Sequence, residues 1–168
     1  ITCPAGYMEP AKAKKCIQTL QQWGYEVWTG NTLKGKSKNY FSGTDDERAH
    51  ELQAMLDAPE IKAILCGRGG YGVSRIIDRL DFKQFKKNPK WLIGFSDITL
   101  LHCHIHQQCK IASMHAPMAS AFNDGKNKYT QLLNELLTGK TNRYEIKKHR
   151  LNRIGKGEGL LEIGRAHV

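Results

Sequence analysis

Two short loops carry residues whose types and spacing suit catalysis. The first is the glycine loop, residues 67–72, which reads Gly-Arg-Gly-Gly-Tyr-Gly between a predicted strand and a predicted helix. Glycine permits positive φ angles and a close approach of the backbone to a ligand. Successive N–H groups beside a helix N-terminus can hold a phosphate, a carboxylate or a transient oxyanion. Arg68 can grip a substrate carboxylate with its guanidinium fork, or lie on the surface without a role. The simpler interpretation of the loop is a tight structural turn.

The second loop is Gly-Phe-Ser-Asp at 94–97, which places Ser96 between a predicted strand and a predicted helix. A sharp turn of this kind exposes the serine hydroxyl, and the helix N-terminus behind it favours developing negative charge. The backbone N–H of Asp97 would then point at an oxyanion. The usual elbow has a second glycine two residues after the serine, where this chain has Ile98, so a different turn geometry is expected. The alternative is that Ser96 or Asp97 caps the helix.

An alternation of short apolar runs with helical patterns positions both loops. Strands are predicted at 1–3, 25–28, 61–66, 91–95 and 111–115. Helices are predicted at 13–20, 44–56, 73–80, 98–105 and 132–137, the second opened by a Thr44…Glu47 capping box and the last ended by Gly139. This order predicts an α/β fold with a flavodoxin-like parallel sheet and helices on both faces. Both loops then lie at the carboxyl ends of strands, where such sheets bind ligands.

The charge balance and the cysteines limit the classes of partner and compartment. Lys and Arg number 26 against 16 Asp and Glu, a net charge of +10 that is compatible with a nucleic-acid partner. The basic residues are scattered over predicted helices and loops, so we interpret them as a solvated surface and expect no nucleic-acid partner. No apolar run reaches about 18 residues, which predicts no membrane partner. Five cysteines without C-x-x-C spacing predict a reducing, cytoplasmic compartment.

Histidines and tryptophans offer weaker functional signals. His102 and His106 share a predicted helix face at a spacing that zinc can use, but H-E-x-x-H is absent. We therefore interpret His102, His104 and His106 as helix-surface residues, and we expect neither a metal nor a cofactor. The three tryptophans lie in or beside predicted core elements, so packing is the expected role for all of them.

Five segments carry a resemblance to a known family. They are Arg-Gly-Gly-Tyr-Gly at 68–72, Asn-Pro-Lys at 88–90, Ile-Gly-Phe-Ser-Asp-Ile-Thr at 93–99, Tyr-Phe-Ser-Gly-Thr-Asp at 40–45 with Arg48, and His-Ala-Pro-Met at 115–118. In order and spacing they resemble the L,D-carboxypeptidases, serine peptidases that include muramoyltetrapeptide carboxypeptidases and microcin C self-immunity peptidases. The last segment has alanine where the family has glycine. The similarity runs over about residues 1–160.

The resemblance implies a Ser-His-Glu mechanism. Ser96 carries over as the nucleophile, and the oxyanion hole is formed by the N–H of Asp97 and one from Gly69-Gly70. The family's glutamate and histidine lie in a C-terminal domain beyond this chain, and a serine without its base is a weak nucleophile, so the fragment is expected to be inactive alone.

The expected reaction is hydrolysis of the L,D-peptide bond of a murein tetrapeptide. It would release a terminal D-amino acid during cytoplasmic cell-wall recycling, in a full-length homodimer. One alternative is an immunity-type peptidase that cleaves an aminoacyl-nucleotide antibiotic. The other is a non-catalytic flavodoxin-like module that binds phosphate in the glycine loop.

The expected organisation has three parts. Residues 1–142 form an N-terminal α/β nucleophile domain, and 143–161 form a linker and the start of a truncated C-terminal domain, with a strand at 143–148. Residues 162–168 match one reading frame of a common sequencing adapter and are interpreted as non-native. Ile1 is not a natural start, so residues upstream of it are expected.

Overall fold

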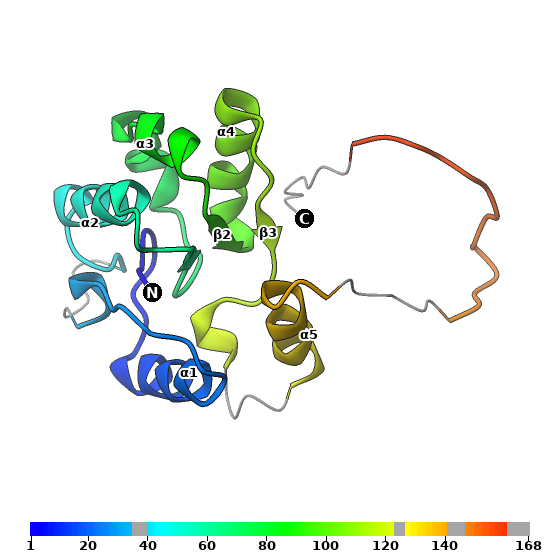
Figure 1. The fold of residues 1–168 in the computed structure, drawn as a ribbon, viewed down its shortest axis with the longest axis horizontal. Helices are drawn as coiled ribbons and strands as arrows, with labels where there is room; N and C mark the ends of the chain where they lie inside the picture. Colours follow the sequence, from blue (N-terminus) through cyan, green and yellow to red (C-terminus); the bar gives the residue numbers. More distant parts are fainter. Residues whose placement is uncertain (35–39, 123–126, 141–146, 161–168) are drawn as a thin grey trace.

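A parallel sheet lies between helices in the computed structural model, which describes residues 1–34, 40–122, 127–140 and 147–160 (Figure 1). Within these ranges the strands are β1 (Ala63–Leu65), β2 (Trp91–Gly94) and β3 (Met114–His115), in the order β1-β2-β3. Ile93 of β2 pairs with Leu65 on one side and with Met114 on the other. A parallel bridge from Thr2 to Cys66 places the predicted first strand beside β1. The predicted α/β class is confirmed.

Helices cover both faces of the sheet. They are α1 (Pro10–Gln22), α2 (Asp45–Asp57), α3 (Lys83–Lys87), α4 (Thr99–Cys109) and α5 (Lys128–Leu137). Successive side chains of a strand point to opposite faces. Ile64 and Leu92 accordingly pack in one apolar cluster with α2, α3 and α4, whereas Leu65 and Ile93 pack in a second cluster with α1 and α5. Figure 1 shows these two groups of helices on either side of the strands.

Local sequence signals explain where helices α2 and α5 begin and end. The Thr44 hydroxyl accepts a hydrogen bond from the Glu47 N–H at 3.2 Å, and the Glu47 carboxylate accepts one from the Thr44 N–H at 2.7 Å. This is the predicted capping box, and it satisfies two N–H groups that a helix start leaves open. Helix α5 stops two residues before Gly139, whose φ of +83° suits glycine.

Two predicted elements are wrong. Residues 73–80 form two 3₁₀ turns, η2 (Val73–Arg75) and η3 (Ile77–Arg79), because Ile76 between them has a φ of −121°, outside the helical range. Residues 25–28 form no strand. Ile1 bonds the carbonyl of Trp28 and the N–H of Gly30, and this single pair of bonds is not continued into a ladder.

The remaining short elements are 3₁₀ turns, and the tryptophans only partly follow the prediction. The turns are η1 (Asn31–Leu33), η4 (Ser96–Ile98) and η5 (Ala119–Ala121). Trp23 packs against Phe122, with ring centroids 5.8 Å apart. Trp28 and Trp91 are 50% and 41% exposed, so the packing role predicted for them is wrong. Trp91 is the first residue of β2, and Trp28 lies in the irregular segment between α1 and η1.

The last described segment, residues 147–160, is exposed throughout and contains no helix or strand. In Figure 1 it runs away from the body of the protein. Most of the predicted strand at 143–148 and all of residues 162–168 lie outside the described residues, so the three-part organisation stays a prediction. In the described ranges, no helix has the length and apolarity needed to cross a membrane.

Candidate active site

Ser96 sits at the sharp turn between β2 and α4 with its side chain exposed. Its φ is +62°, in the left-handed region that a residue with a side chain seldom adopts. The capping positions of η4 and α4 belong to Phe95 and Ile98, so Ser96 caps neither element. Such strained residues persist only where the surrounding structure fixes them, and they cluster at functional sites.

The glycine loop runs directly beside Ser96. A Cβ placed on Gly69 would lie 3.0 Å from both the Cβ and the Oγ of Ser96, and 3.4 Å from the backbone nitrogen of Asp97. Gly70 has a φ of +145°, and a Cβ there would lie 2.9 Å from the nitrogen of Gly6. The structure therefore brings Ser96, Asp97, Gly69 and Gly70 together at one edge of the sheet. Gly70 has both a positive φ and too little space for a Cβ, and a side chain at 69 would crowd Ser96.

Two further segments support the glycine loop from the other side. The Gly6 N–H, just after the first strand, donates to the Gly69 carbonyl at 3.1 Å. Residues 40–42 hold that segment in turn, because the Ser42 N–H donates to Ala5 and the Tyr7 N–H donates to Tyr40. The family-like segment at 40–45 is thus part of the wall around the site.

Two buried charged side chains hold the end of the glycine loop. Arg48 Nη1 donates to the carbonyl of Gly72 at 2.9 Å and to that of Pro4 at 2.7 Å. The carboxylate of Asp97 accepts the N–H of Val73 at 3.0 Å. Arg48 and Asp97 are 0% and 1% exposed. The sequence pointed to the Asp97 N–H alone and named Arg48 only within a motif, so both side-chain contacts were missed.

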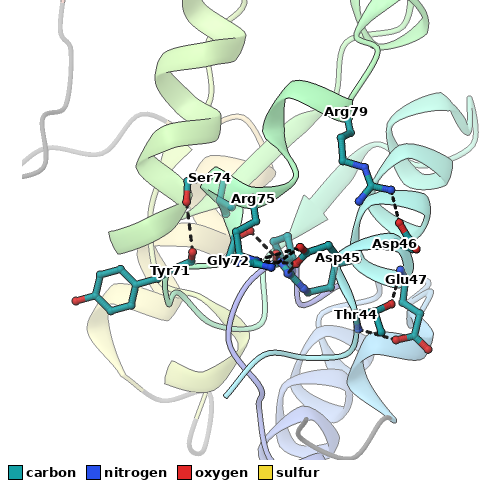
Figure 2. Close-up of polar contacts among 12 residues, drawn as sticks. Thr44, Asp45, Asp46, Glu47, Tyr71, Gly72, Ser74, Arg75 and Arg79 are labelled. Atoms are coloured by element: carbon teal, nitrogen blue, oxygen red, sulfur yellow. Dashed lines mark hydrogen bonds and ion pairs between the residues drawn. The ribbon is translucent and has the colours of Figure 1, made fainter. Parts of the chain in front are cut away.

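Asp45 keeps Arg48 in place from the start of α2. Its carboxylate pairs with Arg48 and also binds Arg75 through two atoms, at 2.9 Å to Nε and 2.7 Å to Nη2. Figure 2 shows Asp45 and Arg75 meeting beside Gly72. The hydrogen bond from Arg75 holds the pKa of Asp45 below its ordinary value. Burial lowers the pKa of Arg48, which Asp45 opposes, and an arginine stays charged regardless.

Arg68 lies on the surface of the glycine loop. Its Nη1 donates to the Tyr7 carbonyl at 3.0 Å, and its guanidinium lies 5.6 Å from the centre of the Tyr40 ring. These contacts direct the side chain along the loop and toward the 40–42 segment. Its grip on a substrate carboxylate stays a prediction.

His102 is buried on α4 at 4% exposure, so its interpretation as a helix-surface residue is wrong. Its Nε2 lies 3.0 Å from the Gly94 carbonyl and its Nδ1 lies 2.8 Å from Ser113 Oγ. A carbonyl only accepts, so Nε2 donates and Nδ1 of the neutral ring accepts from the Ser113 hydroxyl. Burial lowers the pKa of His102. Among the described residues, no three His, Cys, Asp or Glu side chains form a group that could hold a metal.

Two cysteine thiols near the glycine loop are poorly suited to act as a nucleophile. Cys3 and Cys66 are fully buried beneath the glycine loop. Burial raises the pKa of Cys3 to about 12 and raises that of Cys66 as well. Because only the thiolate is a good nucleophile, these residues act as small apolar side chains. The hydroxyl of Ser96, by contrast, belongs to an exposed residue.

Two cavities lie at opposite ends of the sheet. The larger, of about 810 Å³, is lined by residues at and before the amino ends of β1 and β2, such as Lys62, Lys90 and Trp91, and by strand residues such as Leu65 and Ile93. The smaller, of about 280 Å³, is lined by Phe95, His115 and neighbours at the carboxyl end of β2. Ser96, Asp97 and the glycine loop line neither cavity, and the smaller one reaches the turn at Ser96 only through its neighbour Phe95.

Comparison with known proteins gives consistent matches. A family model described as the LD-carboxypeptidase N-terminal domain matches residues 1–116. The chain is 39% identical over 120 residues to a probable murein peptide carboxypeptidase of Bacillus subtilis, covering 71% of this chain and 37% of that protein. It is 33% identical over 101 residues to the Microcin C7 self-immunity protein MccF of Escherichia coli, covering 60% of this chain and 29% of that protein.

A solved structure has the same fold. The crystal structure of muramoyltetrapeptide carboxypeptidase from Oxalobacter formigenes matches with a TM-score of 0.70 at 26% identity, covering 82% of this chain and 47% of that one. This chain therefore spans less than half the length of each of the three proteins.

Proposed function

This chain belongs to the LD-carboxypeptidase family, and on that premise we propose that it carries the nucleophile of a serine carboxypeptidase. The substrate is a murein tetrapeptide, and the reaction hydrolyses its L,D-peptide bond and releases the terminal D-amino acid. The observation that carries the proposal is the exposed Ser96 at a φ of +62°, with the Gly69 backbone and the Asp97 N–H beside it.

The proposed reaction combines this geometry with the Ser-His-Glu mechanism that the family resemblance implies. Ser96 Oγ attacks the carbonyl carbon of the L,D bond and loses its proton to a histidine base that a glutamate orients. The carbonyl oxygen becomes an oxyanion and accepts hydrogen bonds from the Asp97 N–H and from an N–H of Gly69-Gly70. Collapse of the intermediate expels the D-amino acid, whose amine takes the proton back from the histidine. The histidine then deprotonates a water molecule that hydrolyses the ester on Ser96 and returns the proton to Oγ. No cofactor enters these steps.

We assign the histidine and glutamate to the C-terminal part of the full-length protein. Support comes from the greater length of the relatives. The described residues of this chain by themselves should therefore hydrolyse substrate very slowly. We further propose that the full-length protein is a cytoplasmic homodimer that acts in peptidoglycan recycling.

The test is release of D-alanine from a tetrapeptide with a terminal L,D bond by the full-length protein. Ser96→Ala should lower kcat by about 10⁴-fold or more, as removal of the nucleophile does in other serine hydrolases. Substrate should still bind, because Ser96 acts only along the reaction path. If Ser96→Ala keeps more than about a tenth of the wild-type rate, Ser96 is not the nucleophile.

The second candidate function is that of an immunity-type peptidase, which the match to MccF supports. Its substrate would be an aminoacyl-nucleotide, cleaved by the same serine. The two candidates are separated by supplying both substrates to the full-length protein and comparing kcat/KM. A higher kcat/KM for the aminoacyl-nucleotide than for the murein tetrapeptide would identify the aminoacyl-nucleotide as the substrate. Ser96 would remain the proposed nucleophile.

A further inference from the structure

One peptide group is held from both sides by buried charges. The Gly72 carbonyl accepts from Arg48, and the Val73 N–H donates to Asp97, and these two groups belong to the same planar peptide unit. The negative end of the peptide dipole faces a cation, and its positive end faces an anion. Hydrogen bonds to ionised groups are about twice as strong as neutral ones, so this peptide is fixed more firmly than an ordinary turn.

Burying two charges is costly unless they are compensated. Arg48 reaches three acceptors in different segments: the Pro4 carbonyl, the Gly72 carbonyl and the carboxylate of Asp45. Its guanidinium also lies 4.9 Å from the centre of the Phe41 ring. These contacts tie the segments at residues 4 and 41–45 to the end of the glycine loop.

Asp97 links this arrangement to the nucleophile. It follows Ser96 directly in the chain, and its own nitrogen lies beside Gly69. Its carboxylate reaches the other end of the glycine loop at Val73. A shift of the Gly72–Val73 peptide would therefore change the gap between Ser96 and Gly69-Gly70, in which the oxyanion is to be held.

From these contacts we propose that Arg48 and Asp97 are a pair of positioning residues that set the geometry of the oxyanion hole. Both side chains are buried and so do not touch the substrate, whereas the backbone N–H of Asp97 is one of the proposed oxyanion donors. They act through the Gly72–Val73 peptide, which they clamp from opposite sides. This inference rests on the proposed function, because it assumes that Ser96 and Gly69-Gly70 bind the reacting carbonyl.

The test uses the full-length protein with Asp97→Ala, Asp97→Asn, Arg48→Met, Arg48→Lys and the double variant Arg48→Met/Asp97→Ala. Asn keeps an acceptor for the Val73 N–H, and Lys keeps the positive charge. The matched control is Arg79→Met, because Arg79 also pairs with an acidic residue of α2, Asp46, but is exposed and away from the loop. The readouts are kcat and KM for D-alanine release, the rate of Ser96 labelling by a fluorophosphonate, and the thermal unfolding midpoint.

Loss of one oxyanion donor costs about 10²–10³-fold in kcat, which sets the upper limit for a misplaced one. We expect kcat and the labelling rate to fall about 10- to 10³-fold in Asp97→Ala and Arg48→Met, with KM within about threefold. Asp97→Asn and Arg48→Lys should each recover part of the loss. The kcat of the double variant should be only slightly lower than that of the less active single variant, because both residues hold the same peptide. Arg79→Met should keep the wild-type kcat.

Other results overturn the clamp. A rise in KM without a fall in kcat, or a double variant whose loss is the product of the single losses, means that the two residues act separately. If the alanine and methionine variants do not fold, the two conservative variants decide. Lysine at position 48 cannot reproduce the several bonds that the guanidinium makes to Pro4, Gly72 and Asp45. Wild-type kcat in both folded Arg48→Lys and folded Asp97→Asn therefore contradicts the proposal. Failure of the proposed function looks different: Ser96→Ala then remains active, whereas failure of the clamp alone leaves Ser96→Ala inactive.

Discussion

His102 donates a hydrogen bond from Nε2 to the carbonyl of Gly94 over 3.0 Å, and so holds the strand end that leads into Ser96. The same carbonyl accepts the Ala116 N–H at 3.2 Å. Together these bonds fix the peptide at which β2 ends. The neutral ring is the form that burial favours, since burial lowers the pKa of His102.

The first prediction concerns stability and pH. The pKa of His102 lies below 6.5 in the folded protein, so the unfolded chain binds this proton more readily as the pH falls through 6.5. The contribution of neutral His102 to the free energy of unfolding should therefore be fully present above pH 6.5. It should be lost as the pH falls from 6.5 to the lower pKa of the folded protein. Urea unfolding at about pH 7.5 and about pH 5.0 measures the difference. His102→Gln, whose amide can still donate to Gly94, should show a smaller difference.

His50→Gln is the control for that experiment, because His50 is exposed on α2. It should leave the pH dependence as in the wild type. An equal pH dependence in His102→Gln and the wild type would show that His102 does not carry this proton linkage. His115 lies 6.3 Å from His102 between ring centroids, so a His115→Gln variant separates its contribution.

The second prediction concerns the space beside Ser96, the proposed nucleophile. Gly69→Ala would place a methyl group 3.0 Å from Ser96 Oγ, in the path of the substrate carbonyl. We expect the fluorophosphonate labelling rate of the full-length protein to fall by about 10²-fold or more, comparable to loss of an oxyanion donor. Gly157→Ala is the control, because a Cβ added at Gly157 would meet no atom within 4 Å beyond its chain neighbours. It should label at the wild-type rate. If Gly69→Ala is labelled at the wild-type rate, the reacting carbonyl does not bind between Ser96 and Gly69.

The third prediction concerns Lys90, a buried lysine at the amino end of β2. Its Nζ donates to the carbonyls of Met55 and Ala58 at the end of α2, at 3.1 Å and 2.5 Å. Lys90→Met removes the Lys90 donor from the Met55 carbonyl and leaves the Ala58 carbonyl with the Ile61 N–H at 3.3 Å. It should lower the free energy of unfolding by about 1–3 kcal/mol. Lys62→Met is the matched control, because Lys62 bonds the Pro59 carbonyl from an exposed position. If urea unfolding shows that both substitutions lower the free energy of unfolding equally, the burial of Lys90 does not strengthen the contribution of its hydrogen bonds.

Local patterns predict much of the fold because they record local physics. Apolar runs mark β1 and β2, the spacing of Thr44 and Glu47 marks the start of α2, and Gly139 marks the end of α5. The helix predicted at 73–80 fails because the exposed and buried positions of two 3₁₀ turns imitate a helical period over this short distance.

The site itself is only half predictable from sequence. Ser96 and the glycines stand out because a serine at a strand-to-helix turn and a cluster of glycines are local signals. The roles of Arg48 and the Asp97 carboxylate are set by contacts with residues 24 positions away in the chain. Likewise, His102 appears in the sequence as one of three similar helix residues, and only packing of α4 on β2 shows that it is buried.

The last prediction concerns the strain at Ser96. A residue with a Cβ pays about 1–2 kcal/mol to occupy the left-handed region, and glycine largely avoids this. Ser96→Ala and Ser96→Gly both lack Oγ and should both be inactive, but Ser96→Gly should be more stable than Ser96→Ala by about 1 kcal/mol in urea unfolding. Lys110, with a φ of +59° at the end of α4, provides the comparison. Lys110→Gly should exceed Lys110→Ala in stability by a similar amount. If the gain occurs at 110 and not at 96, the turn at Ser96 relaxes in solution and its strain cannot be part of the mechanism.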